Sequence, residues 1–277
     1  MAIDAAKLRK TGIYDTRAPL PTLLADLDQI GGMVQAAEAT RRRVRIYSGL
    51  AMILGIVCAV LAGLVGSTVF SFLCFLTFAL GVGLFIYSFI TGRDFHKHHD
   101  RYELLRDISK GIQPDADPRA KFAVKLQMKS NRSFVREEPV PHRKNGKQKF
   151  YEEQFLSISG ELLDGTHIEE TVTELARERT YTNPRGKTKS KTRQRYLLNV
   201  ALYYPGDVYG DARHAQHLLS EKIHVPTSAM VKNVNVTEKA ISVKTMLRAE
   251  KEIPRASSMV CLGAYRILNL ARRGAGK

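Results

Sequence analysis

The feature that most constrains the fold is a run of 47 residues, Ile46 to Gly92, that contains no Asp, Glu, Lys, Arg or His. A bilayer core of ~30 Å needs ~20 apolar residues per helix, so this run has the length of two spans and a turn. Glycines within Gly63–Thr68 predict the turn. We therefore expect a transmembrane helical hairpin with spans at Ile46–Val65 and Thr68–Ile90. The alternative is a pair of core helices in a soluble protein, and an uncharged run of this length argues against it.

Basic residues flank the run on both sides and predict its orientation. Four arginines lie within residues 41–45, and Arg93, Lys97, Arg101 and Arg106 follow the run, whereas the turn carries no charge. Because Lys and Arg collect on the cytoplasmic side, both termini are expected in the cytosol, at a plasma or inner membrane. Three cysteines without paired spacing also fit a reducing compartment.

The rest of the chain predicts helices before and after the run, and then strands. Apolar residues recur at helical spacing from Pro21, and again after Arg93. Beyond Pro118 the period changes to two, and three hairpins are expected, around "LDGT", around "NPRG" and within residues 229–247. Residues 131–149 are predicted to form a polar loop and residues 211–223 a helix, and residues 257–272 suit either a helix or a strand.

These observations predict a membrane-anchored α+β protein. Its expected parts are an N-terminal cytosolic arm with an amphipathic helix (1–45), a two-helix transmembrane hairpin (46–92), a juxtamembrane helix and linker (93–117), and a basic, mostly antiparallel β-sandwich or open-barrel cytosolic domain (118–277).

The positive charge is concentrated in the predicted β domain. Residues 113–277 carry +12 of the total net charge of +16. Every second residue from Arg185 to Arg195 is a cation, so on a strand these six side chains would share one face. Arg177 and Arg179, on the preceding strand, also occupy odd-numbered positions. The predicted anion-binding residues are Arg177, Arg179, Arg185, Lys187, Lys189, Lys191, Arg193 and Arg195.

The hairpin turn decides what lies opposite these cations. A two-residue turn at Pro184-Arg185 would pair Arg179 with Ser190, whereas a loop one residue longer would pair it with Lys191. Charge repulsion disfavours the second arrangement unless an anion is bound.

Two explanations of the basic hairpin remain open. It could be a solvated tip whose lysines prevent edge-to-edge pairing. It could instead bind anionic lipid headgroups or an acidic protein partner, because it is tethered close to a membrane. Nucleic acid is not expected, since Tyr181 and Tyr196 are the only aromatic residues beside the basic run.

No catalytic signature accompanies these features. The segment "GKTKS" lacks the glycine that a phosphate-binding loop needs five residues before Gly186, where Tyr181 stands. Histidines at 96, 98 and 99 and at 214 and 217 offer too few converging ligands for a metal site. We expect no metal and no cofactor, and we favour a protein that is not an enzyme.

Small residues predict close helix packing in the first span, at Gly55, Ala59 and Gly63. The sequence thus predicts a membrane-anchored, non-enzymatic interaction or scaffold protein that binds a partner or anionic surface, as an oligomer or a subunit of a membrane complex. The alternative is an oligomeric two-span effector or channel gated by the cytosolic domain.

Overall fold

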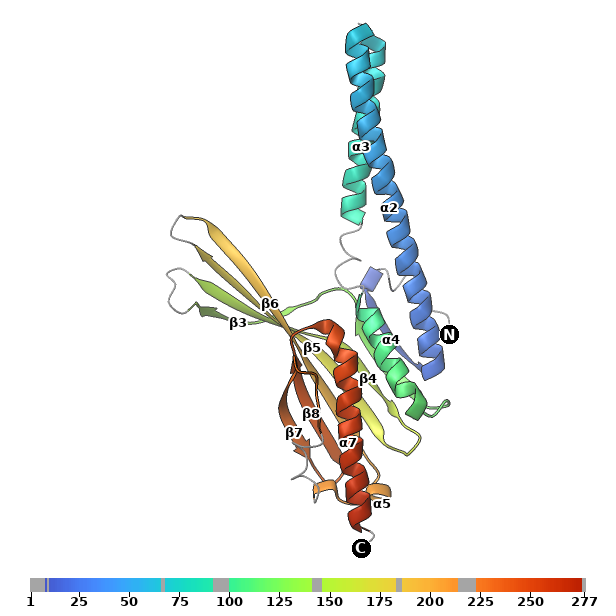
Figure 1. Cartoon of the computed structure of the whole chain (residues 1–277), viewed down its shortest axis with the longest axis vertical. Coiled ribbons are helices and arrows are strands. Elements are labelled where there is room, and N and C mark those ends of the chain that lie inside the picture. The colour runs from blue at the N-terminus through green and yellow to red at the C-terminus, as the bar shows by residue number, and fades with distance from the viewer. Residues whose placement is uncertain are drawn as a thin grey trace. The chain divides into compact units, whose positions relative to one another are not determined.

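The chain folds into two compact units, seen in a computed structural model (Figure 1) that describes residues 8, 10–65, 68–91, 100–140, 146–182, 186–213 and 223–275. The β unit comprises Met1–Leu27 and Asp100–Lys277, and the helical unit comprises Asp28–His99. The boundary falls inside one continuous helix, α2 (Leu20–Val65). The predicted N-terminal arm is therefore divided, and its first part belongs to the β unit.

The β unit is built on one antiparallel sheet. Its strands are β1 (Ile13–Pro19), β2 (Lys121–Gln127), β3 (Ser133–Pro139), β4 (Lys147–Glu161), β5 (His167–Thr182), β6 (Thr188–Tyr203), β7 (Met230–Val236) and β8 (Ala240–Leu247). The order is β1-β2-β4-β5-β6-β8-β7, with β3 paired to β4 outside this path. Among the described strands, β1 and β7 end this order, so the sheet is open.

Helices cover one face of the sheet, in the place that a second sheet would occupy in a sandwich. The helix α4 (Asp100–Ile112) contacts β2, and α7 (Ile253–Ala275) contacts β6, β8 and α4 (Figure 1). Short helices among the described residues include α5 (Gly206–Tyr209) and the 3₁₀ turns Gln113–Asp115 and Glu250–Glu252. The α+β class and the antiparallel sheet are confirmed. The predicted sandwich or open barrel is wrong, because amphipathic helices bury the apolar face.

Side chains alternate between the two faces of the sheet along each strand, so every second side chain faces these helices. Val124, Ile158, Glu170, Val200 and Val243 form one cross-strand row through β2, β4, β5, β6 and β8, and all five are buried. Four of them are the apolar residues that such a face requires. The fifth, Glu170, places a carboxyl group in the centre of the core.

β3 and parts of β4, β5 and β6 continue as a ribbon beyond the helix-covered part of the sheet, and we call this ribbon the arm (Figure 1). On one side β8 pairs with β6 over Tyr196–Tyr203 only, and on the other β2 pairs with β4 over Leu156–Ser159 only. The arm comprises Ser133–Pro139, Lys147–Glu153, Glu174–Thr182 and Thr188–Arg195. The prediction of a polar loop over residues 131–149 is therefore wrong, because β3 and the start of β4 occupy most of it.

The other local expectations have mixed outcomes. Hairpins form between β4 and β5, between β5 and β6, and between β7 and β8. Residues 257–272 are helical, and they bury Val260, Ala264 and Ile267 on one side of α7. Most of the helix expected after residue 210 lies outside the described residues.

The helical unit contains most of α2 and the helix α3 (Thr68–Thr91). One helix is long and apolar enough to cross a membrane, within Leu20–Leu61, and the described apolar stretch of α3, Phe72–Tyr87, is shorter. Large apolar side chains along both helices are exposed; Leu64 is 80% exposed and Phe72 67%. Apolar surface of this extent normally contacts lipid or another protein.

Two glycines bring α2 and α3 into backbone contact. A Cβ atom on Gly55 would lie 2.8 Å from the Cβ atom of Phe78 and 3.0 Å from its backbone nitrogen. A Cβ atom on Gly81 would lie 3.0 Å from the backbone nitrogen of Met52 and 3.1 Å from the carbonyl oxygen of Ser48. The two helices therefore approach each other at positions where only glycine fits without a shift of the backbone.

Replacing either glycine with alanine is expected to destabilise the helix pair by ~1–3 kcal/mol, because the backbone must move to admit the methyl group. Detergent unfolding followed by far-ultraviolet circular dichroism measures this change. The controls are Gly49→Ala in α2 and Gly83→Ala in α3, where nothing lies within 4 Å of the new methyl group. They are expected to be neutral or to stabilise by up to ~1 kcal/mol, since alanine favours helices over glycine. Equal effects at all four positions would mean that α2 and α3 do not pack in this way.

Candidate functional site

The cations predicted to bind anions lie on the β5–β6 hairpin of the arm. Arg177 lies opposite Arg193, Arg179 opposite Lys191, Tyr181 opposite Lys189, and Leu175 opposite Arg195. Lys187 is exposed in the connection between the strands, and Arg185 lies outside the described residues. We call the set Arg177, Arg179, Lys189, Lys191, Arg193 and Arg195 the basic face.

The hairpin adopts the register of the longer of the two connections considered above, in which Arg179 lies opposite Lys191. The ladder ends at the pair Thr182–Thr188, so five residues connect the strands, and Gly186 has a positive φ of 74° that suits glycine. In this register arginine and lysine side chains from both strands project from the same side. The arrangement that charge repulsion disfavours is thus the one that the chain adopts.

The basic face surrounds a cavity of about 150 Å³, which we call the basic pocket. It is lined by Val140, Arg177, Arg179, Tyr181, Lys191 and Arg193. Burial, together with the charges of Arg179, Arg193 and Arg195, lowers the pKa of Arg177 below its ordinary value. The repulsion is therefore felt at the guanidinium group itself.

Neighbouring side chains hold part of the basic face in place. Nε of Arg179 donates to Oε1 of Gln148 at 3.2 Å, and Nε2 of Gln148 donates to Oε2 of Glu138 at 3.0 Å. Arg136 lies opposite Phe150, which lies opposite Arg177. The guanidinium of Arg136 is 4.7 Å from the ring centroid of Phe150 and pairs with Glu138 at 3.1 Å. Glu138 is thus occupied by Arg136 and Gln148.

The two sides of the arm differ in how their charges are paired. On the side opposite the basic face, Glu137 pairs with Lys147 at 2.9 Å and with Lys149 at 3.8 Å, and Glu178 accepts a hydrogen bond from Ser190. Across the described parts of the chain, no carboxylate forms an ion pair with the six cations of the basic face. Unpaired positive charge is therefore confined to one side of the arm.

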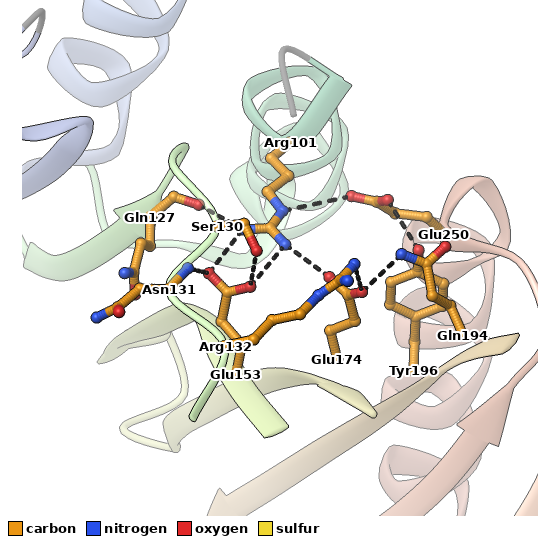
Figure 2. Close-up of polar contacts among 10 residues, drawn as sticks. All are labelled: Arg101, Gln127, Ser130, Asn131, Arg132, Glu153, Glu174, Gln194, Tyr196 and Glu250. Atoms are coloured by element: carbon orange, nitrogen blue, oxygen red, sulfur yellow. Dashed lines mark hydrogen bonds and ion pairs between the residues drawn. The ribbon is translucent and has the colours of Figure 1, made fainter. Parts of the chain in front are cut away.

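A buried ionic network lies at the base of the arm (Figure 2). Arg101, near the start of α4, is 1% exposed, and its guanidinium bonds Glu153 at 3.2 and 3.3 Å and Glu174 at 2.8 Å. It also donates to the carbonyl oxygen of Gln127 at 2.8 Å and lies 4.1 Å from the ring centroid of Phe155. One side chain thus joins α4 to β2, β4 and β5.

Further residues satisfy the two carboxylates of this network. Glu153 accepts from Ser130 Oγ and from the backbone amide of Asn131, and Glu174 accepts from Arg132 at 2.5 Å and Gln194 at 2.8 Å. Burial alone would raise the pKa of Glu153, but the bonds from Arg101, Asn131 and Ser130 outweigh it and lower the pKa. The network fixes the arm to the helix that directly follows the apolar segments in the chain.

Glu170 is a further buried acid, and it lies outside this network. It is fully buried beneath α7, and its Oε2 accepts a hydrogen bond from Ser257 Oγ at 2.8 Å. Its Oε1 has no hydrogen-bond partner within the described residues. Burial raises the pKa of Glu170 to about 7, against the smaller opposing effect of Ser257.

The remaining predicted site residues lie as follows. Gly55 is buried against Phe78, Ala59 is exposed, and the surroundings of Gly63 lie outside what the structure describes. Both histidine clusters also lie outside the described residues, and within those residues no group of three or more His, Cys, Asp or Glu could hold a metal ion. The basic face is the strongest candidate for a functional site.

No protein-family model, curated protein or solved structure matches this chain.

Proposed function

We propose that this protein is a membrane-anchored interaction protein whose β unit binds an anionic surface at the cytosolic face of the membrane through the basic face. Anionic lipid headgroups are the favoured partner, and an acidic protein at the membrane is the alternative partner. The protein acts as a scaffold and has no catalytic role, as an oligomer or a subunit of a membrane complex.

The unpaired cations carry this proposal. Opposed like charges destabilise a sheet, and the chain places two such pairs side by side at Arg177–Arg193 and Arg179–Lys191. A bound anion would offset this repulsion. Lysines on the outer strand alone would prevent a hairpin tip from pairing with the edge of another sheet. That role does not require cations on both strands of the hairpin.

The apolar helices support the membrane anchor. In this proposal α2 and α3 both cross the bilayer as a hairpin, joined by their glycine contact, with the arginines at 41–45 and both termini on the cytosolic side. An oligomeric channel has less support, since Gly55 and Gly81 pack α2 against α3 within one chain and no Asp, Glu, Lys, Arg or His occurs from Ile46 to Gly92.

The test measures binding of the full chain, held in nanodiscs of zwitterionic lipid, to vesicles that contain phosphatidylserine. Each Lys or Arg near an anionic surface is worth ~1 kcal/mol, so Lys191→Glu with Arg193→Glu is expected to weaken binding by about 30-fold or more. Binding of the native chain is expected to fall steeply with added salt.

The matched control is Lys125→Glu with Lys244→Glu, which makes the same change in net charge. Both lysines are exposed on β2 and β8, away from the arm. We expect this variant to retain at least half of the binding. Equal losses in the two variants would show that net charge rather than the basic face drives the interaction. No vesicle binding by the native chain would reject the lipid partner.

A further inference from the structure

The basic pocket places four cations around one small volume. Arg177 and Arg179 on β5 face Arg193 and Lys191 on β6. Directly opposed residues of an antiparallel pair have Cβ atoms ~4.5–5.5 Å apart, and alternate residues of a strand are ~7 Å apart. The four side chains therefore rise from the corners of a small rectangle, around a cavity of about 150 Å³.

The pocket is suited to a compact group with more than one negative charge. Its guanidinium groups are planar, and each presents two parallel N–H donors that match a pair of phosphate oxygens. The ammonium group of Lys191 can donate to a further phosphate oxygen. A carboxylate brings one charge and two oxygens. A phosphate monoester brings a charge of about −1.5 to −2 at neutral pH and three acceptor oxygens.

Part of the pocket is held ready for a ligand. The Nε atom of Arg179 is bound by Gln148, which leaves its terminal nitrogens for an anion, and Glu138 orients Gln148. Val140 is buried and, with Tyr181, lines the pocket beside the four cations. A ligand in the pocket therefore meets cations on two strands and at least one guanidinium group whose orientation is already fixed.

We propose that the basic pocket binds a phosphate monoester group, through Arg177, Arg179, Lys191 and Arg193. This inference rests on the proposed function and narrows it, because it makes the basic face selective for one chemistry among anions. The group is the terminal phosphate of a lipid headgroup or of a soluble phosphorylated compound. In both cases the same four cations surround the phosphate oxygens.

The experiment compares vesicles of two kinds at equal surface charge, with the full chain in zwitterionic nanodiscs. One kind contains phosphatidic acid, which exposes a phosphate monoester, and the other contains phosphatidylserine, which does not. The native chain is expected to bind phosphatidic acid vesicles about tenfold more tightly. Calorimetry with inorganic phosphate and pyrophosphate, without vesicles, forms the soluble arm.

A charge-conserving variant separates the pocket from general attraction. Arg193→Lys keeps the net charge but removes the planar fork, so it is expected to remove most of the preference for phosphatidic acid and to leave phosphatidylserine binding within about twofold. The control is Arg195→Lys, on the same strand, whose guanidinium contacts Met246 Sδ at 3.5 Å and does not line the pocket. It is expected to leave the preference intact.

The outcomes distinguish this inference from the proposed function. Equal binding to both vesicles, unchanged in Arg193→Lys, overturns the phosphate pocket while the anionic surface stands. Binding only to phosphate or pyrophosphate in solution supports the pocket, assigns it a soluble ligand and rejects the lipid surface. A preference for phosphatidic acid without binding in the soluble arm assigns it a lipid headgroup. An absence of binding in every arm overturns both proposals.

Discussion

Replacing Arg101 with methionine is expected to lower the free energy of unfolding of the full chain by about 3–5 kcal/mol, since loss of one partner leaves buried charge uncompensated. Glu153 and Glu174 lie within 3.3 Å of this guanidinium, and both are almost fully buried. Methionine fills much of the arginine stem but supplies no hydrogen bond. Urea unfolding in detergent, followed by tyrosine fluorescence, measures the change, because the chain has 11 tyrosines and no tryptophan.

Two further variants make the result specific to the network. Arg106→Met changes the same residue type in the same helix, at a side chain that is 30% exposed and 3.8 Å from Asp107, and is expected to cost less than ~1 kcal/mol. Adding Glu153→Gln and Glu174→Gln to Arg101→Met removes the stranded charges and is expected to restore part of the loss. If Arg101→Met and Arg106→Met cost the same, Arg101 does not occupy a buried network.

Several of the strands that the sequence predicted bury one face. Buried residues alternate with less buried ones along β2, along β8 and from His167 to Ala176 of β5, and this period of two is visible in the sequence. β3, "SFVREEP", has no buried residue, and it is an outer strand of the arm that pairs with β4. It therefore carries no alternation, and its pairing with β4 could not be inferred from its own residues.

The helices that cover the sheet, α4 and α7, lie far apart in the sequence and could not be assigned from the strands alone. Alternation shows that a sheet has one apolar face but does not say what covers it. The helical pattern of α7, with Ala256, Val260, Ala264 and Ile267 buried, is present in the sequence, yet its "YRILNL" segment equally suits a strand. The register of the basic hairpin was likewise open, because it depends on the length of one loop.

Buried charges were the hardest part of the site to predict. Arg101 looked like a cytosolic flanking charge, and its partners Glu153 and Glu174 stand 52 and 73 residues away, so no local pattern joins them. Glu170 differs, because it alternates in phase with Ile168 and Val172 on the buried face of β5. Its position in the strand was a usable signal.

Glu170 is expected to make the stability of the β unit fall as pH rises. Burial raises its folded-state pKa from the ordinary 4.5 to about 7, so the folded chain holds the proton more tightly than the unfolded chain. The stability that the folded chain gains from holding this proton is fully present below about pH 4.5 and is lost as pH rises to about 7. A shift of this size corresponds to about 3 kcal/mol, because each pKa unit is worth ~1.4 kcal/mol.

Glu170→Gln removes this titration, so its unfolding free energy relative to the native chain is expected to rise by about 3 kcal/mol between about pH 4.5 and pH 8. Any fixed cost of burying the amide cancels in this difference, as do the other titrating groups that both proteins share. The matched control is Glu169→Gln, one residue along β5, where the side chain is 48% exposed and bonds Tyr203. A pH dependence in Glu169→Gln as large as that in Glu170→Gln would mean that the burial of Glu170 is not its cause. Urea unfolding at a series of pH values measures both, and a flat profile for Glu170→Gln would mean that the native carboxyl is already ionised within the core, with a compensating partner for its Oε1 atom.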